Sequence, residues 1–171
     1  MSDNTPSLAQ EVQSLLKMPQ SLCKQRGICC RVATFRELMD EASIRHLAET
    51  DETTLGEMAR DFISIFEAFP SQVAVRELAD GFVDRVRARA EEIGKDPDAV
   101  GFFGCKFVLE DGRCGVHEDR PTGCRTYPFP HERTLYHPGC GFEAQGKQNW
   151  ARIKTILEGL GLDPETMQEK S

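Results

Sequence analysis

The chain is organised around one stretch, Cys105-Lys-Phe-Val-Leu-Glu-Asp-Gly-Arg-Cys114-Gly-Val-His-Glu-Asp-Arg-Pro-Thr-Gly-Cys124-Arg-Thr-Tyr-Pro-Phe129. Its three thiols are almost evenly spaced, and its glycines and prolines exclude a long helix. A fourth thiol, Cys140, follows downstream, and three more, Cys23, Cys29 and Cys30, lie far upstream. Because all the cysteines fall in two short segments of the chain, the simplest interpretation is that they bind metal together.

Composition predicts a soluble globular protein with one core. The chain has 171 residues, of which 39% are hydrophobic, and this length favours one domain over two. Its formal net charge of -7 argues against a nucleic-acid partner, because phosphate binding depends on an excess of clustered Lys and Arg.

The N-terminal sequence and the cysteine count predict a cytoplasmic protein with no membrane segment. Met1 to Ser7 has neither a basic start nor the apolar run of a signal peptide, and no window approaches a membrane span. In a reducing compartment thiols stay reduced, and seven cysteines could not all pair within one chain. Metal-binding or catalytic thiols are therefore favoured over disulfides.

Apolar periodicity predicts a mainly helical scaffold. Ser7 is a candidate N-cap for the first helix, and Thr34 with Glu37 forms a capping-box pattern for the second. Two apolar stripes, one before Pro70 and one before Gly94, indicate a helical hairpin. The expected helical segments are 8–16, 35–49, 55–69, 78–93 and 150–160.

The cysteine-rich segments are expected to be less regular. Residues 21–31 are predicted to form a loop, in which Gly27 relieves the backbone between the thiols. Asp111-Gly112 favours a tight turn, so that 107–109 and 114–116 would form the arms of a hairpin. Arg120-Pro121 would open a short helical turn that Pro128 closes.

The predicted fold class is therefore mainly α, a single domain of four to five helices with a cysteine-rich metal-binding lobe and one small β-hairpin. The helical scaffold would comprise residues 7–100 and 147–162, and the lobe residues 21–31 plus 101–142, within one domain of residues 1–171. The tail after Asp163 is expected to be loosely held.

All seven thiols are candidate metal ligands, because soft sulfur suits both zinc and iron-sulfur clusters. Seven exceed the needs of one tetrahedral ion, which leaves three alternatives: bridging thiolates, two sites completed by a histidine, or one cluster with spare cysteines. Two C-x2-C pairs, the usual zinc-ribbon spacing, are absent from the sequence. The predicted ligands are Cys23, Cys29, Cys30, Cys105, Cys114, Cys124 and Cys140, and the predicted cofactor is an iron-sulfur cluster or zinc.

Other residues of the lobe have ordinary interpretations beside functional ones. His117, His131 and His137 could each bind zinc, but the sequence favours solvent-exposed turn residues, and His46 is expected on a helix surface. Arg31, Arg120 and Arg125 could offset thiolate charge, or pair with Glu118 or Asp119. Tyr127 and Phe129 are expected to pack as a cover over the site.

These residues resemble the YkgJ-type cysteine-cluster family, described as zinc- or iron-chelating proteins. The family pattern has an upstream C-x2-C-x2-C-C, then a cysteine, a Gly-x-Cys turn and Arg-Pro-x-x-Cys-Arg-x-Tyr-Pro-Phe. The matching residues here are Cys23, Gly27, Cys29, Cys30, Cys105, Gly112, Cys114, the run Arg120 to Phe129, and Cys140 beyond it. The resemblance covers roughly Cys23 to Phe142, apart from the helical insert.

One departure concerns the second cysteine of the upstream pattern, where this chain has Arg26. If that family position is a ligand, the resemblance implies one of three alternatives: a histidine, His137 or His117, in its place; one incomplete site; or an open coordination position.

The resemblance implies a metal-binding protein that acts as a chelating or protein-partner-binding module. A flagellin lysine methylase looks similar in its cysteine-rich region, which suggests the alternative of an iron-sulfur or metal-dependent enzyme of redox or methyl-transfer type. The sequence itself names no reaction.

Overall fold

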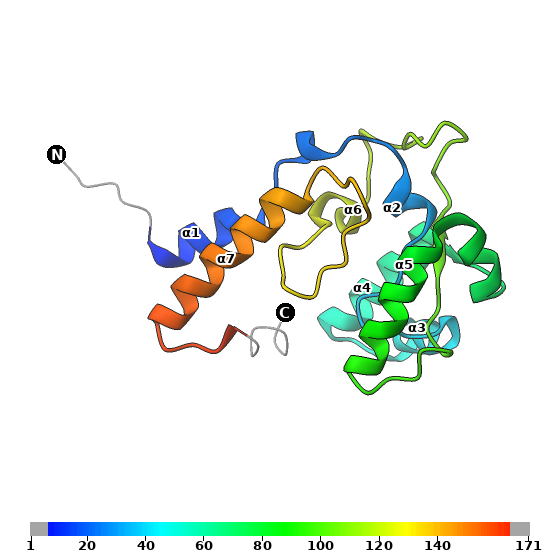
Figure 1. The fold of residues 1–171 in the computed structure, drawn as a ribbon, viewed down its shortest axis with the longest axis horizontal. Coiled ribbons are helices and arrows are strands. Elements are labelled where there is room, and N and C mark those ends of the chain that lie inside the picture. The colour runs from blue at the N-terminus through cyan, green and yellow to red at the C-terminus, as the bar shows by residue number, and fades with distance from the viewer. Residues whose placement is uncertain (1–6, 165–171) are drawn as a thin grey trace. The chain divides into compact units, whose positions relative to one another are not determined.

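The computed structural model describes residues 7–164 (Figure 1). Two compact units make up the chain: Gln25–Gly123, here called the central unit, and Met1–Lys24 with Cys124–Ser171, here called the terminal unit. The elements in chain order are α1 (Leu8–Leu16), the 3-10 turn η1 (Gln20–Leu22), α2 (Ile28–Arg31), α3 (Glu41–Thr50), α4 (Thr54–Ile65), β1 (Phe66–Ala68), α5 (Gln72–Glu92), β2 (Phe103–Cys105), α6 (Thr122–Thr126) and α7 (Glu143–Gly159). The mainly α class with one small antiparallel sheet is confirmed, while the single domain stays a prediction.

The central unit has an aromatic core between α3, α4 and β2. Phe103 and Ile44 are fully buried, and the Phe62 ring lies edge-on to Phe35 and Phe103 at centroid distances of 5.3 and 5.0 Å. Phe62 also stacks on Phe66 at 4.6 Å. Edge-on and offset-stacked aromatic pairs add to the free energy gained by burying their area. Phe62 and Phe66, which belong to the apolar stripe before Pro70, are partly buried and pack against this core.

Strand β2 connects the core to the cysteine-rich segments. It pairs antiparallel with β1, with Phe66 opposite Cys105 and Ala68 opposite Phe103. On its other edge, Ala33 and Phe103 exchange backbone hydrogen bonds of 2.8 and 2.9 Å. The sheet thus holds the residues just after α2 beside β2, and it brings segments 70 residues apart in sequence together.

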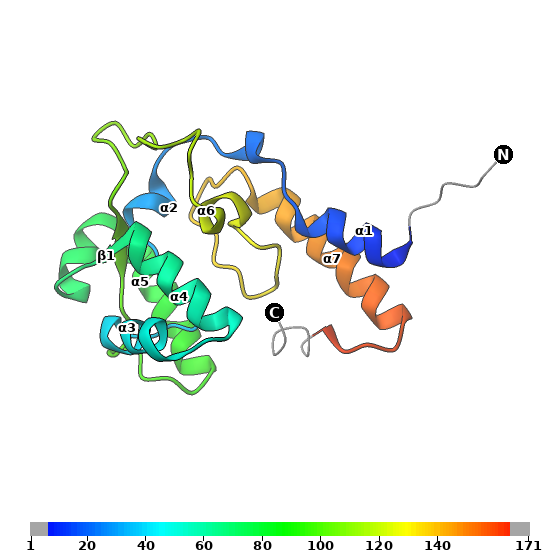
Figure 2. The same ribbon diagram turned by 180° about the vertical axis from the view of Figure 1, so that it is seen from behind.

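The predicted helical hairpin is wrong at its first arm. Helix α4 ends at Ile65, and Phe66 to Ala68 extend as β1 because β2 supplies their backbone partners. Helix α4 packs against α3, as Figure 2 shows. Helix α5 follows but contains a non-helical residue, Ala79, and Leu78 just before it is 58% exposed.

The predicted helix over residues 35–49 begins later than expected. Its N-cap is Asp40, whose Oδ1 accepts from the Ser43 N–H at 2.8 Å, and not Thr34. Phe35 and Leu38 lie in a turn with both side chains buried, and Leu38 has a φ of 47°. Burial of these apolar residues in the core outweighs the capping-box pattern.

Two predictions about the lobe need correction. Residues 21–31 do not form a plain loop, because they include the end of η1 and the single helical turn α2. The arms expected at 107–109 and 114–116 form only one bridge, Val108 opposite Cys114, and the sheet lies at β1 and β2 instead. The tight turn itself is confirmed: Gly112 has a φ of 86°, and its N–H donates to the Leu109 carbonyl at 2.9 Å. Helix α6 follows Pro121 as expected.

The terminal unit pairs α1 with α7, which lie side by side in both views (Figures 1 and 2). Ser7 caps α1 in a capping box with Gln10, as the sequence predicted for the cap. Trp150 and Ile153 of α7 pack with Leu15 of α1, and the sequence predicted this apolar stripe. The predicted tail lies largely outside the described residues. No helix among residues 7–164 is long and apolar enough to cross a membrane.

The Asp40 cap allows a direct test of the start of α3. We expect Asp40→Ala to lower the free energy of unfolding by about 1 kcal/mol at neutral pH, because the Ser43 N–H loses its acceptor. The Ser43 hydrogen bonds lower the pKa of Asp40. The difference in the free energy of unfolding between wild type and Asp40→Ala should therefore be fully present above about pH 3.9, the pKa of the carboxyl group in the unfolded chain. It should vanish as the pH falls through the lower pKa of the folded state.

Urea unfolding at several pH values measures this effect. Glu49→Ala, an exposed change on the same helix, is the control and should not lower the midpoint. Equal midpoints for Asp40→Ala and wild type at pH 7 would contradict the assignment of the cap.

Candidate metal centre

Two glycines bring the upstream and downstream cysteine segments of the central unit into backbone contact. Gly27 has a φ of 68°, and a Cβ at that position would collide with the backbone of Gly112. A Cβ at Gly112 would lie 2.7 Å from the Arg26 carbonyl oxygen. Both positions therefore require glycine, for space as well as for backbone conformation. The sequence indicated a special backbone conformation at each of these glycines, but it did not indicate that the two are in contact.

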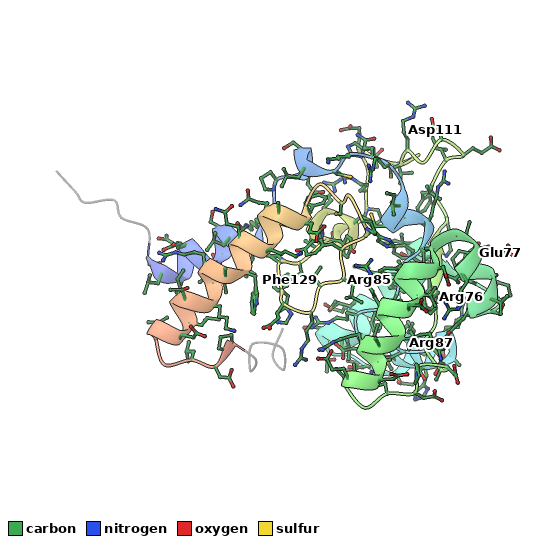
Figure 3. All side chains as sticks on the ribbon, in the orientation of Figure 1. Arg76, Glu77, Arg85, Arg87, Asp111 and Phe129 are labelled. Carbon is green, nitrogen blue, oxygen red and sulfur yellow. The ribbon has the colours of Figure 1, made fainter. Side chains whose placement is uncertain are left out.

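A side-chain hydrogen bond reinforces this contact. The Arg31 guanidinium donates to the Glu110 carbonyl oxygen at 2.8 Å, which ties the end of α2 to the downstream turn. Asp111 projects from the tip of this turn in Figure 3 and accepts from the Arg113 N–H at 3.0 Å. The turn is thus held from both sides of its tip.

Four of the seven predicted ligands belong to the central unit. Cys29 and Cys30 lie in α2, Cys105 ends β2, and Cys114 forms the bridge with Val108. All four thiols are half-buried and none forms a disulfide. Because Ala33 pairs with β2, the end of α2 is held beside the strand that ends at Cys105.

The thiols of the central unit affect one another's pKa values. The Cys29 hydrogen bond, and to a lesser degree the charge of Arg120, lower the pKa of Cys30 to about 7 against the opposing effect of burial. Burial raises the pKa of Cys105, and the nearby Cys30 and Cys114 raise it more. The direction of this effect agrees with the predicted role of Arg120 in offsetting thiolate charge, which stays a prediction.

The terminal unit contains Cys23, Cys124 and Cys140. Cys23 and Cys140 pack against the same buried cluster of Met18, Tyr136 and Phe142. A Cβ on Gly141 would collide with the Leu22 carbonyl oxygen, so a close backbone approach joins the neighbours of these two cysteines. Cys124 lies in α6. The side-chain amide of Gln20 donates a hydrogen bond of 2.8 Å to the carbonyl oxygen of Arg125, the residue after Cys124.

The histidines of the lobe are less exposed than the sequence suggested. His137 is only 4% exposed, and His117 and His131 are half-buried. The His131 ring lies against Trp150 at a centroid distance of 4.3 Å, with the two rings tilted by 48°. The expectation of solvent-exposed turn residues is therefore wrong for all three, whereas His46 is exposed on α3 as expected.

The expected aromatic cover is also wrong. Tyr127 and Phe129 are 45% and 46% exposed, while Pro128 and Pro130 between and after them are fully buried. Figure 3 labels Phe129 on this segment.

The donor chemistry of the central unit suits zinc or iron, because thiolates are soft ligands and Arg120 supplies compensating charge. Across residues 7–164, no group of three or more His, Cys, Asp or Glu side chains is already arranged to hold a metal ion.

Comparison with known families identifies the cysteine pattern. Residues 22–141 match the family model CxxCxxCC, described as "Putative zinc- or iron-chelating domain". The chain belongs to this family. No curated protein and no solved structure matches the chain. In the CxxCxxCC pattern Cys23, Cys29 and Cys30 occupy three of the four upstream positions, and Arg26 stands where the family has its second cysteine.

The contact between Gly27 and Gly112 predicts a strong effect of one methyl group. Gly112→Ala should lower the free energy of unfolding by about 1–3 kcal/mol, because alanine disfavours the positive φ and its Cβ meets the Arg26 carbonyl oxygen. Chemical denaturation under reducing conditions measures the change.

Gly81→Ala is the matched control. Gly81 lies within α5, and a Cβ there would meet nothing within 4 Å. The control should be neutral or stabilising, by about 0.5–1 kcal/mol. If Gly112→Ala were as stable as Gly81→Ala, the backbone contact would not hold the two segments together.

Proposed function

We propose that this protein binds an iron-sulfur cluster or zinc through its clustered cysteines and acts as a metal-chelating or partner-binding module. The principal centre is assigned to Cys29, Cys30, Cys105 and Cys114 of the central unit. The observation that carries this proposal is the contact between Gly27 and Gly112, which holds segments from the two ends of this unit in one place. Membership of the zinc- or iron-chelating family supports it.

The remaining thiols, Cys23, Cys124 and Cys140, are proposed as the ligand group of the terminal unit. Their family pattern and the shared packing of Cys23 and Cys140 support this assignment. Buried His137 lies near Cys140, whose N–H donates to the His137 carbonyl at 3.0 Å.

Between the two metals we favour the iron-sulfur cluster, because the cysteine spacing lacks the paired C-x2-C of zinc ribbons. Anaerobic purification followed by absorption spectroscopy and metal analysis tests this choice. A brown protein with iron, sulfide and broad visible charge-transfer bands is the expected result. A colourless protein with stoichiometric zinc would overturn the choice of cluster but retain metal binding.

Metal removal should lower stability. Because ligands from distant segments converge only in the folded chain, binding free energy contributes to folding. We expect a chelator to lower the melting midpoint under anaerobic conditions, and restored metal to return it. A melting curve identical with and without bound metal would argue against a centre that links the two segments.

Single substitutions identify the ligands of the central unit. Cys105→Ala and Cys114→Ala should each reduce the bound metal per chain by more than half, because each removes a thiolate. His46→Ala, on the exposed face of α3, is the control and should retain the wild-type metal content. Full metal content in both cysteine variants would place the centre elsewhere.

A further inference from the structure

The His117 side chain has a buried ring nitrogen that the rest of the central unit does not use. Its Nδ1 is inaccessible to solvent and has no hydrogen-bond partner within residues 7–164. A buried polar atom without a partner costs free energy, and in native proteins it calls for an explanation. A lone pair kept free in a thiol-rich lobe is what a metal ion requires from imidazole.

The opposite ring nitrogen has a partner that can set the tautomer. The His117 Nε2 lies 3.4 Å from the Nε2 of Gln25, on the exposed side of the ring. The oxygen and nitrogen of an amide exchange places by a half-turn, so Gln25 can present its carbonyl oxygen instead. Nε2–H then donates to Gln25, and the proton-free Nδ1 faces the interior. Metal-binding histidines generally donate their second ring N–H in this way.

The position of His117 corresponds to the gap in the family pattern. Gln25 directly precedes Arg26, which stands where the CxxCxxCC pattern has a cysteine. The Arg26 carbonyl packs on Gly112, within the same turn that leads to Cys114 and His117. The His117 ring therefore lies beside the segment in which the expected thiolate is missing.

Arg120 connects His117 with the thiols. Its Nε donates to the His117 carbonyl oxygen at 2.9 Å, and its charge acts on Cys30. The side chain thus fixes the backbone of His117 within electrostatic reach of an assigned ligand.

We propose that His117 binds metal through Nδ1 in the central unit, with Gln25 orienting the ring, and thereby replaces the cysteine that this chain lacks at position 26. The bound metal is an iron of the proposed cluster or zinc, held by thiolates together with one imidazole. This inference rests on the proposed metal-binding function. It means that His117 fills the coordination position of the missing cysteine, which is therefore not left open.

The first test uses the intact protein with Zn²⁺ alone as the probe, reduced and free of oxygen. Long-range proton–nitrogen spectra of the ¹⁵N-labelled chain resolve the ring nitrogens of its four histidines. One equivalent of Zn²⁺ should shift the Nδ1 resonance of His117 and leave its Nε2 protonated. The His117→Ala spectrum assigns the resonance. An unchanged His117 ring in a protein that has bound Zn²⁺ overturns the proposal.

Affinity measurements provide the second test. His117→Ala should weaken Zn²⁺ binding at least tenfold, and Gln25→Ala by about tenfold, as for other residues that orient a ligand. His46→Ala should bind as wild type does. Arg26→Cys introduced into His117→Ala should recover most of the lost affinity, because a thiolate returns at the family position.

The outcomes distinguish a failure of the His117 proposal from a failure of the proposed metal-binding function. If the wild-type chain binds no stoichiometric Zn²⁺ or iron, both are wrong. If it binds metal but His117→Ala has wild-type affinity, metal binding stands and the role of His117 is overturned. Because the nitrogen spectrum is recorded on wild type, poor folding of a variant does not remove the test.

Discussion

Backbone contact between Gly27 and Gly112 is the constraint on which the cysteine-rich part of the central unit depends. The absence of two Cβ atoms lets segments distant in sequence approach closely enough for α2, the downstream turn and Cys114 to share one region. The terminal unit contains a similar contact, in which Gly141, the residue after Cys140, approaches the carbonyl oxygen of Leu22, the residue before Cys23. In each unit a close backbone approach thus holds thiol-bearing segments side by side, and none of the seven cysteines forms a disulfide.

The helical core gives the thiol segments a rigid support. Phe103 packs edge-on against the Phe62 ring of α4, and its backbone also exchanges hydrogen bonds with Ala33, so the same residue anchors the hydrophobic core and the end of α2. Cys105 is two residues further along that strand. Packing in the core thus limits how far Cys105 can move from α2, because side chains in close-packed interiors tolerate little displacement. Metal binding would then need mainly side-chain rotation.

The sequence by itself determined the elements whose signals are local. Helices α1 and α7 follow from apolar periodicity with Ser7 as a cap, α6 follows Pro121, and the turn at Gly112 follows from Asp-Gly. The choice of thiols as candidate ligands also needed only residue chemistry and spacing. The inferences about these helices and this turn succeed because the deciding interactions span few residues.

Only the tertiary structure decided the features whose partners are distant. Residues 66–68 leave the helical pattern because β2, more than thirty residues away, supplies their hydrogen bonds. Helix α3 begins at Glu41, after its Asp40 cap, and not near Thr34, because Phe35 is buried in the core. The division of the cysteines between two units and the buried Nδ1 of His117 likewise follow from folding. Spacing along the chain carries no information on burial or on which far segment a backbone meets, and these two quantities decided the rest.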